Sequence, residues 1–388
     1  MKPTDLRGKV AIVGASEADE IGVVPGKPAV ALQAEGVLNA LADAGLDKKD
    51  VDGIFVAGNG FSPAASLGEY LGISPRYVDG TNVGGCSFMA LVQHAMLALH
   101  AGVIDCAVVA HGESGRSRVG MPIPPVTPDS VLGQFESPFG TFGPTTTFPL
   151  AAVRHMHRYG TRREQFAEVA VATRKWARLH PKAFMKDPLT IDNVMNARLV
   201  CWPMTLPMCC LVTDAGGGLV LTRADRARHL RKPPVYILGA GQATEHAMVS
   251  MMDDMTSSAA ARVSGRDAFA MAGLGPSDMQ VAELYDAFAF TPMFALEDLG
   301  FCKPGESGAF VSGQRTAPGG AFPMNTNGGG LSYTHSGMYG MYPLIELTRQ
   351  LRGECGERQV SGARVGIAHG PGGMFSAAAT IIASAESP

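Results

Sequence analysis

Apolar positions along the chain alternate between short continuous runs and helical spacing, as is typical of an α/β protein. Residues 10–15 form an apolar run that predicts a buried strand. Residues 28–44 carry apolar side chains at helical spacing, and Gly45 is a suitable residue to end that helix. Residues 51–57 predict a second strand. Strands that alternate with helices favour mostly parallel sheets covered by helices.

The second half of the chain repeats this order of elements. Residues 235–240 resemble the opening strand, residues 272–279 resemble residues 44–51, and residues 368–373 resemble residues 110–115. The three matches keep the same order along the chain. We therefore interpret the sequence as the duplication of a whole α/β domain rather than as an array of short repeats.

The region between the two halves has a different character. Residues 120–149 are rich in proline, glycine, serine and threonine, residues 162–179 predict a helix, and residues 213–222 predict a strand that resumes the first half. Long insertions commonly carry binding functions. We expect three parts: an N-terminal half from residues 1–112 plus 206–230, an inserted loop region at 113–205, and a C-terminal half at 231–388.

Composition excludes several classes of protein. Hydrophobic residues make up 46% of the chain and charged residues 17%, so a large core is expected and wholesale disorder is not. Aromatic residues make up 7% and the net charge is −3, which argues against nucleic-acid binding and against attraction to an anionic membrane. No apolar run reaches membrane-spanning length, so we expect no membrane span.

The cysteines and the N-terminus predict a cytoplasmic protein. The seven cysteines are an odd number and form no CxxC pair, which favours a reduced protein whose cysteines are mostly small core residues. The N-terminal residues lead directly into the first strand without the apolar segment of a signal peptide. We expect no metal site, because the two histidines at 155 and 157 lack further ligands.

Cys86 is the first candidate for chemistry. Gly84 and Gly85 precede it, and an apolar helix follows it to about residue 101. A cysteine at the start of a helix meets free N–H groups and the positive end of the helix dipole, which both favour a thiolate. The alternative is a small core cysteine beside a helix-entry turn.

His335 is the second candidate. It lies in a glycine-rich loop at residues 325–340, just before a helix predicted at 342–351. A Cys/His pair is the usual way to activate a thiol nucleophile, and the two residues need not be close in sequence. The three glycines at 328–330 could suggest a phosphate-binding loop, but no GK[ST] motif follows them.

His369 and Tyr285 complete the candidates. His369 ends a strand and precedes flexible backbone, where a histidine can perform acid–base chemistry, or simply cap a loop. His111 occupies the duplicated position, so a histidine there need not be catalytic. Tyr285 follows a strand and could donate a hydrogen bond to a developing oxyanion. An aromatic residue at a domain interface is the alternative.

These residues, in this order, resemble the thiolase superfamily over essentially the whole chain, particularly its sterol carrier protein X-type branch. The Gly-Gly-Cys-Ser motif at Cys86 is similar to the family's nucleophile motif, and the glycine-rich loop before His335 is similar to its Gly-His-Pro loop. The resemblance implies two βαβαβαββ halves in a five-layered αβαβα sandwich. It also implies a homodimer, an acyl-CoA substrate and no permanently bound cofactor, with coenzyme A as substrate or cosubstrate.

The resemblance also implies a role for each candidate. Cys86 would attack the thioester, His335 would activate the thiol, His369 would be the second acid–base group, and Tyr285 would stand where the family has Asn or His. Pro371 lacks an N–H where a glycine donor is expected. Four glycines would contact coenzyme A: Gly329, Gly330, Gly372 and Gly373.

Together with these residues, the resemblance implies three alternative functions. The first is acyl transfer that cleaves or forms a carbon–carbon bond of a β-ketoacyl-CoA through an acyl-Cys86 intermediate. The second is a thiolase-like retro-aldolase, a lyase that uses Tyr285 on a β-hydroxyacyl-CoA side chain such as that of a steroid; the retained His335 favours the first. The third is a non-catalytic scaffold, since relatives of this branch pair with a small OB-fold, zinc-ribbon partner protein.

Overall fold

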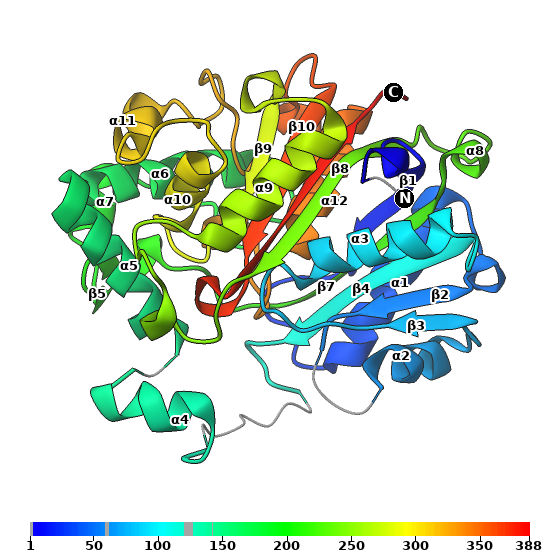
Figure 1. The fold of residues 1–388 in the computed structure, drawn as a ribbon, viewed down its shortest axis with the longest axis horizontal. Coiled ribbons are helices and arrows are strands. Elements are labelled where there is room, and N and C mark those ends of the chain that lie inside the picture. Colours follow the sequence, from blue (N-terminus) through cyan, green and yellow to red (C-terminus); the bar gives the residue numbers. More distant parts are fainter. Residues whose placement is uncertain (1–2, 59–61, 120–126, 142) are drawn as a thin grey trace.

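The computed structural model describes residues 3–58, 62–119, 127–141 and 143–388. Residues 120–126 and 142 of the proline- and glycine-rich stretch lie outside the described residues. The two ends of the chain lie near each other (Figure 1), and a side chain at Gly8 would overlap the ring of Pro388.

Each half of the chain folds as an alternation of strands and helices. The first half contains β1 (Val10–Glu17), α1 (Ala29–Ala44), β2 (Gly53–Val56), α2 (Pro63–Leu71), β3 (Tyr77–Asp79), α3 (Ser87–His100), β4 (Cys106–Ser114), β7 (Asp214–Arg223) and the short α8 (Ala224–Ala227). The second contains β8 (Val235–Thr244), α9 (Ala259–Ala272), β9 (Val281–Leu284), α10 (Thr291–Asp298), α11 (Ser307–Val311), α12 (Met341–Arg352), β10 (Val365–Pro371) and β11 (Ala377–Ser384).

The elements between the halves are mostly helical. They are α4 (Val131–Phe135), η3 (Ser137–Phe139), α5 (Pro144–Tyr159), α6 (Arg163–Leu179), α7 (Ile191–Met195), β5 (Leu199–Cys201) and β6 (Met204–Thr205). The helix predicted at 162–179 is therefore present as α6. In Figure 1 the helices α5, α6, α7, α10 and α11 gather at one end of the molecule, and α4 projects from it. The three-part division of the chain stays a prediction.

The sheet is mixed rather than mostly parallel. Its order is β3-β2-β4-β7-β1-β8-β11-β10-β9. Only β2 with β3, β2 with β4, and β10 with β9 pair in parallel, and the strands in the middle of the sheet are antiparallel. The prediction of mostly parallel sheets was wrong because β7, which follows the inserted region, pairs antiparallel with both β4 and β1. In the second half, β11 follows β10 after a short turn and pairs antiparallel with it, without a crossover helix.

The helices form the layers that the five-layered architecture requires. Helix α1 packs on β1, β4 and β7 of the first half, and α9 packs on β8 and β11 of the second. Helices α3 and α12 each contact strands of both halves and also contact each other. Most of their side chains are buried, as expected for helices packed between the two halves of the sheet. The thiolase-type αβαβα arrangement is confirmed.

The duplication is visible in matched close contacts. A Cβ at Gly14 would overlap the carbonyl oxygen of Ala40 on α1, and a Cβ at Gly239 would overlap that of Ala268 on α9. Each opening strand thus carries a glycine where its helix approaches the backbone. The halves differ at the third strand: within the described part of the second half, a single bridge between Ala282 and Met324 takes its place.

Candidate active site

A cavity of about 470 Å³ lies where the two halves meet. Its walls come from the start of α3, the end of β4, the segment after β9, the glycine-rich loop and the end of β10. The polar or charged side chains in this lining are those of Tyr285, His335, Glu113, Arg118, Thr145, Cys209 and Cys210. The structure therefore brings together two of the four predicted catalytic residues, Tyr285 and His335.

Tyr285 and His335 form one hydrogen-bonded pair. The Tyr285 hydroxyl lies 2.8 Å from Nε2 of His335, and the backbone N–H of Tyr339 donates to the same hydroxyl oxygen at 3.1 Å. The loop that carries His335 is fixed by a hydrogen bond from its backbone N–H to Oγ1 of Thr213 at 2.9 Å. The contact joins the end of β9 to a loop fifty residues further along the chain.

Burial sets the protonation state of this pair. Burial lowers the pKa of His335 to about 4 and raises the pKa of Tyr285 well above its usual value. At neutral pH both groups are uncharged. A neutral phenol that donates to a neutral imidazole can take a proton from a substrate hydroxyl while passing its own to His335.

Cys86 lies outside this cavity. It precedes the first residue of α3, as predicted, but its side chain is only 1% exposed and lines a separate hollow with His94 and Gln242. Burial raises the pKa of the Cys86 thiol to about 12. Its Sγ donates to the carbonyl oxygen of Val83 at 3.9 Å. Helix position alone therefore does not produce a thiolate here.

Gly85, one residue earlier, occupies the position that faces Tyr285. A Cβ at position 85 would overlap Cε1 of the Tyr285 ring. Gly85 and Gly84 both line the cavity. Successive residues at a helix entry point in different directions, so a shift of one position in the motif decides which side chain meets the cavity.

His369 also points away from the cavity. Its Nδ1 lies 2.8 Å from Oγ1 of Thr380, which contacts Ser264 on α9, and burial lowers the pKa of His369 to about 3. His111 instead faces the layer of α3 and α12, with Nε2 2.8 Å from Oγ of Ser336. The two histidines therefore face opposite sides of the sheet although their sequence positions match. A difference of one residue in register is enough to cause this, because successive residues of a strand face opposite sides.

The four glycines predicted to bind coenzyme A fall into two groups. Gly372 and Gly373 line the cavity, but their N–H groups donate to the carbonyl oxygens of Ala377 and Val83. Gly329 and Gly330 are buried away from it. Their N–H groups donate at 2.8 and 2.6 Å to side chains of the loop and of Asp286.

Asp286 is a site residue whose role the sequence did not reveal. Its Oδ1 accepts from the N–H of Gly330 and its Oδ2 from that of Leu331 at 3.4 Å, so it holds the glycine-rich loop against the segment that carries Tyr285. Burial raises the pKa of Asp286 to about 7. The adjacent Tyr-Asp pair in the sequence was the available signal.

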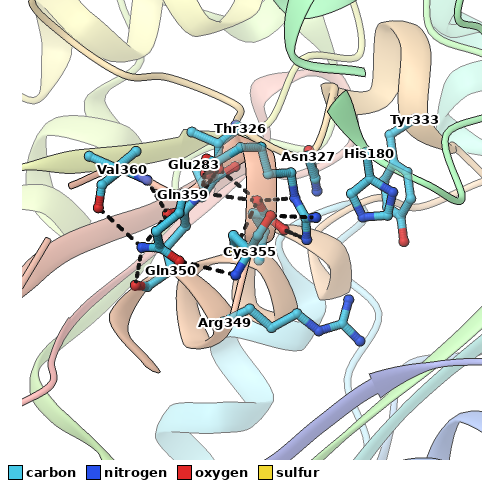
Figure 2. A network of polar contacts seen from close by, with 12 residues as sticks. His180, Glu283, Thr326, Asn327, Tyr333, Arg349, Gln350, Cys355, Gln359 and Val360 are labelled. Carbon is cyan, nitrogen blue, oxygen red and sulfur yellow. Dashed lines mark hydrogen bonds and ion pairs between the residues drawn. The ribbon is translucent and has the colours of Figure 1, made fainter. Parts of the chain in front are cut away.

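A buried polar network lies beneath this loop (Figure 2). Oγ1 of Thr326 lies 2.8 Å from Oε1 of Glu283 and 2.8 Å from Oε1 of Glu346, and it accepts from Gln350. Arg358 donates to both oxygens of Glu346 at 2.9 and 3.0 Å. The network joins β9 to the loop and to α12, and so fixes the position of Tyr285.

One of the two carboxyl groups must carry a proton. The Thr326 hydroxyl has a single hydrogen, so it can donate to only one of them. Burial and the neighbouring Glu346 charge raise the pKa of Glu283 well above its usual value. For Glu346 burial opposes ionisation, but the Arg358 charge and hydrogen bonds outweigh it and lower the pKa. Glu283 is thus the protonated member.

Within the described residues, no cluster of three or more histidine, cysteine, aspartate or glutamate side chains is arranged to hold a metal ion. In the same part of the chain, no helix combines the length and apolar character needed to cross a bilayer.

The layered fold and this cavity define a thiolase-fold enzyme. Residues 241–385 match the family model described as thiolase C-terminal domain-like. The chain is 36% identical to the 17-hydroxy-3-oxo-4-pregnene-20-carboxyl-CoA lyase of Mycobacterium tuberculosis, over 90% of this chain and 92% of that protein. It is 32% identical to an acetyl-CoA acetyltransferase of Methanothermobacter thermautotrophicus, over 90% and 93%.

A solved structure described as an Ltp2-ChsH2(DUF35) aldolase matches with a TM-score of 0.90 and 30% identity, over 98% of each chain. The chain belongs to the thiolase superfamily, in the branch related to sterol carrier protein 2. Its relatives include both acyltransferases and lyases, so membership of the family leaves the reaction class to the site.

Proposed function

We propose that this chain is a lyase that cleaves the Cα–Cβ bond of a β-hydroxyacyl-CoA by a retro-aldol reaction. The observation that carries the proposal is the hydrogen bond between Tyr285 and His335 in a cavity lined by Gly85. The thiol of Cys86 is protonated and faces another hollow. The lyase and aldolase among the relatives support this reaction class.

The pair supplies the base. The Tyr285 oxygen takes the proton of the β-hydroxyl group while its own proton passes to Nε2 of His335, and the N–H of Tyr339 stabilises the phenolic oxygen. The β-carbon becomes a ketone and the Cα–Cβ electrons form the thioester enolate. The amino end of α3, at Gly84 and Gly85, presents the positive end of the helix dipole to that enolate oxygen.

The cavity favours a substrate with a bulky apolar group on the β-carbon. Phe148, Leu211, Val212, Phe288 and Met338 line it. A steroid or a similar ring system has the matching chemistry. Coenzyme A then stays bonded to the shorter acyl-CoA product, and the proposed reaction uses no permanently bound cofactor.

A partner of the kind predicted from the sequence is part of the proposal, because the aldolase structure that resembles this chain contains a DUF35 protein. Dimerisation and a cytoplasmic location stay predictions.

The test is a product analysis. The chain, alone and with a DUF35-family protein from the same source, is incubated with a steroid β-hydroxyacyl-CoA, and separately with a β-ketoacyl-CoA plus coenzyme A. We expect ketone and shorter acyl-CoA from the first substrate, no acyl adduct on Cys86 by mass spectrometry, and retained turnover in Cys86→Ala.

Thiolysis of the β-ketoacyl-CoA, with an acyl group on Cys86 and loss of turnover in Cys86→Ala, would replace this proposal with acyl transfer. Absence of turnover on both substrates, with and without the partner, would favour the non-catalytic scaffold.

A further inference from the structure

A retro-aldol cleavage needs a second proton transfer that Tyr285 and His335 do not supply. Their pair takes up the hydroxyl proton, and the enolate left on the acyl-CoA must then gain a proton at its α-carbon. His369, predicted to serve here, faces Thr380 and α9 instead. Cys86 faces the separate hollow. A different side chain in the cavity has to perform this step.

Glu113 is the carboxyl group in the lining of this cavity. It lies near the end of β4, with its side chain against Gly337, where a Cβ would overlap Oε2. Within the described chain it forms neither an ion pair nor a side-chain hydrogen bond. A carboxyl group that supports the fold normally has such partners, so this one is available to a ligand.

The charge state of Glu113 suits either direction of proton transfer. Burial raises its pKa to about 7, so acid and carboxylate are both populated near neutral pH. The groups that share the cavity are Tyr285, His335, Arg118, Cys209 and Cys210, and Tyr342 lies near from α12. Tyr285 and His335 have pKa values far above and well below 7.

We propose that Glu113 is the catalytic residue that exchanges a proton with the α-carbon of the acyl-CoA. Tyr285 and His335 transfer the other proton, that of the β-hydroxyl group. This assignment rests on the proposed lyase reaction. In cleavage the Glu113 carboxylic acid gives its proton to the enolate carbon and becomes a carboxylate. The products are a ketone and an acyl-CoA, and solvent restores the proton to Glu113 and removes one from His335 after release.

The reverse half of this step can be measured without any lyase substrate. The chain is incubated in D₂O with acetyl-CoA or propionyl-CoA, and deuterium at the α-carbon is followed by mass spectrometry. We expect exchange in the wild type and a loss of about 100-fold or more in Glu113→Gln. The matched control is Glu69→Gln, an exposed carboxyl on α2, which should exchange like the wild type.

Wild-type pH dependence provides a measurement that needs no variant at Glu113. We expect exchange to rise with pH and to reach half its maximum near pH 7, as the Glu113 carboxylate forms. Asp286 has a similar pKa but binds the loop amides, so Asp286→Asn should keep the same midpoint. If Glu113→Gln is poorly folded by circular dichroism, rescue of exchange in Glu113→Ala by formate replaces it.

Two results would overturn the assignment: no exchange by the wild type, or wild-type exchange in folded Glu113→Gln. The experiments distinguish failure of the Glu113 assignment from failure of the lyase proposal. Exchange that depends on Glu113, without cleavage of any β-hydroxyacyl-CoA, would retain this residue's role and reject the lyase. Cleavage of a β-hydroxyacyl-CoA, together with exchange that does not depend on Glu113, would retain the lyase proposal and reject the role of Glu113.

Discussion

Tyr285 is the residue on which the proposed chemistry depends most directly. Phenylalanine at this position keeps the ring against Gly85 but removes the oxygen bound to His335 and Tyr339. We expect Tyr285→Phe to lower kcat by about 10²- to 10⁴-fold, the range for loss of a general acid–base group, with little change in KM. Steady-state kinetics on the β-hydroxyacyl-CoA measure both constants.

Tyr70→Phe is the matched control for that variant. Tyr70 is 56% exposed on α2, so removal of its hydroxyl should leave both constants unchanged. Turnover by Tyr285→Phe within threefold of the wild type would exclude Tyr285 as the base.

Asp286 makes stability depend on pH. Its pKa is about 7 in the folded chain and 3.8 in an unperturbed aspartate, so between these values the folded state holds a proton that the unfolded state has released. The contribution of Asp286 to the free energy of unfolding should therefore fall as pH rises from about 4 to 7, by up to about 1.4 kcal/mol per pH unit. His335 and His369, whose pKa values are lowered by burial, contribute with the opposite sign. We expect the slope of unfolding free energy against pH to be more positive in Asp286→Asn than in the wild type, measured by urea unfolding across this range.

Glu113 and Asp298, whose pKa values are also raised, contribute with the same sign as Asp286 and remain in the Asp286→Asn variant, so only the part of the slope that Asp286 contributes should disappear. Asp253→Asn, at an exposed position, should keep the wild-type slope. Identical slopes in wild type and Asp286→Asn would contradict the buried-proton argument.

At the scale of elements, Thr326 connects β9, the glycine-rich loop and α12 through one hydroxyl group. Valine has the same shape without the hydroxyl, so Thr326→Val leaves buried Glu283 and Glu346 oxygens with fewer partners. We expect a loss of about 1–3 kcal/mol in the free energy of unfolding, the cost of unsatisfied buried polar groups. Denaturant unfolding measures it.

The control is Thr244→Val at an exposed position of β8, which should change stability by no more than about 0.5 kcal/mol. A similarly small effect of Thr326→Val would show that the network tolerates loss of its central hydroxyl.

The sequence predicted the bounds of helices better than the directions in which side chains point and strands run. Periodicity placed α1 with its end at Gly45, α6 and α12 within one or two residues, because these features depend on local spacing and capping. It did not predict that the side chains of Cys86 and His369 face away from the cavity, because the side of a helix entry or strand that a residue faces depends on one-residue register. The mixed pairing of the sheet was missed for a different reason, because it depends on strands that are distant in the sequence.

The sequence indicated candidate site residues only where a side chain suited to acid–base chemistry stood next to the end of a predicted strand or helix. Tyr285 was a candidate because it follows a strand, and His335 because it lies in a glycine-rich loop before a helix. The structure joins these two residues by a hydrogen bond. Asp286 had one signal in the sequence, its place next to Tyr285, whereas Glu113 is an ordinary carboxyl group there. The raised pKa values of both residues come from burial in the folded chain, which the sequence pattern does not show.

At the scale of the whole molecule, the projecting segment of α4 and η3 is the surface that we expect a DUF35-type partner to cover. Val131, Phe135 and Phe139 are 54%, 60% and 85% exposed there, and aromatic side chains of this kind dominate binding when a partner buries them. The double variant Phe135→Ser/Phe139→Ser should weaken binding by roughly 30-fold, about 2 kcal/mol, measured by isothermal titration with the purified partner. Leu38→Ser, an exposed position on α1, should bind like the wild type. Equal affinities for both variants would place the partner on another face.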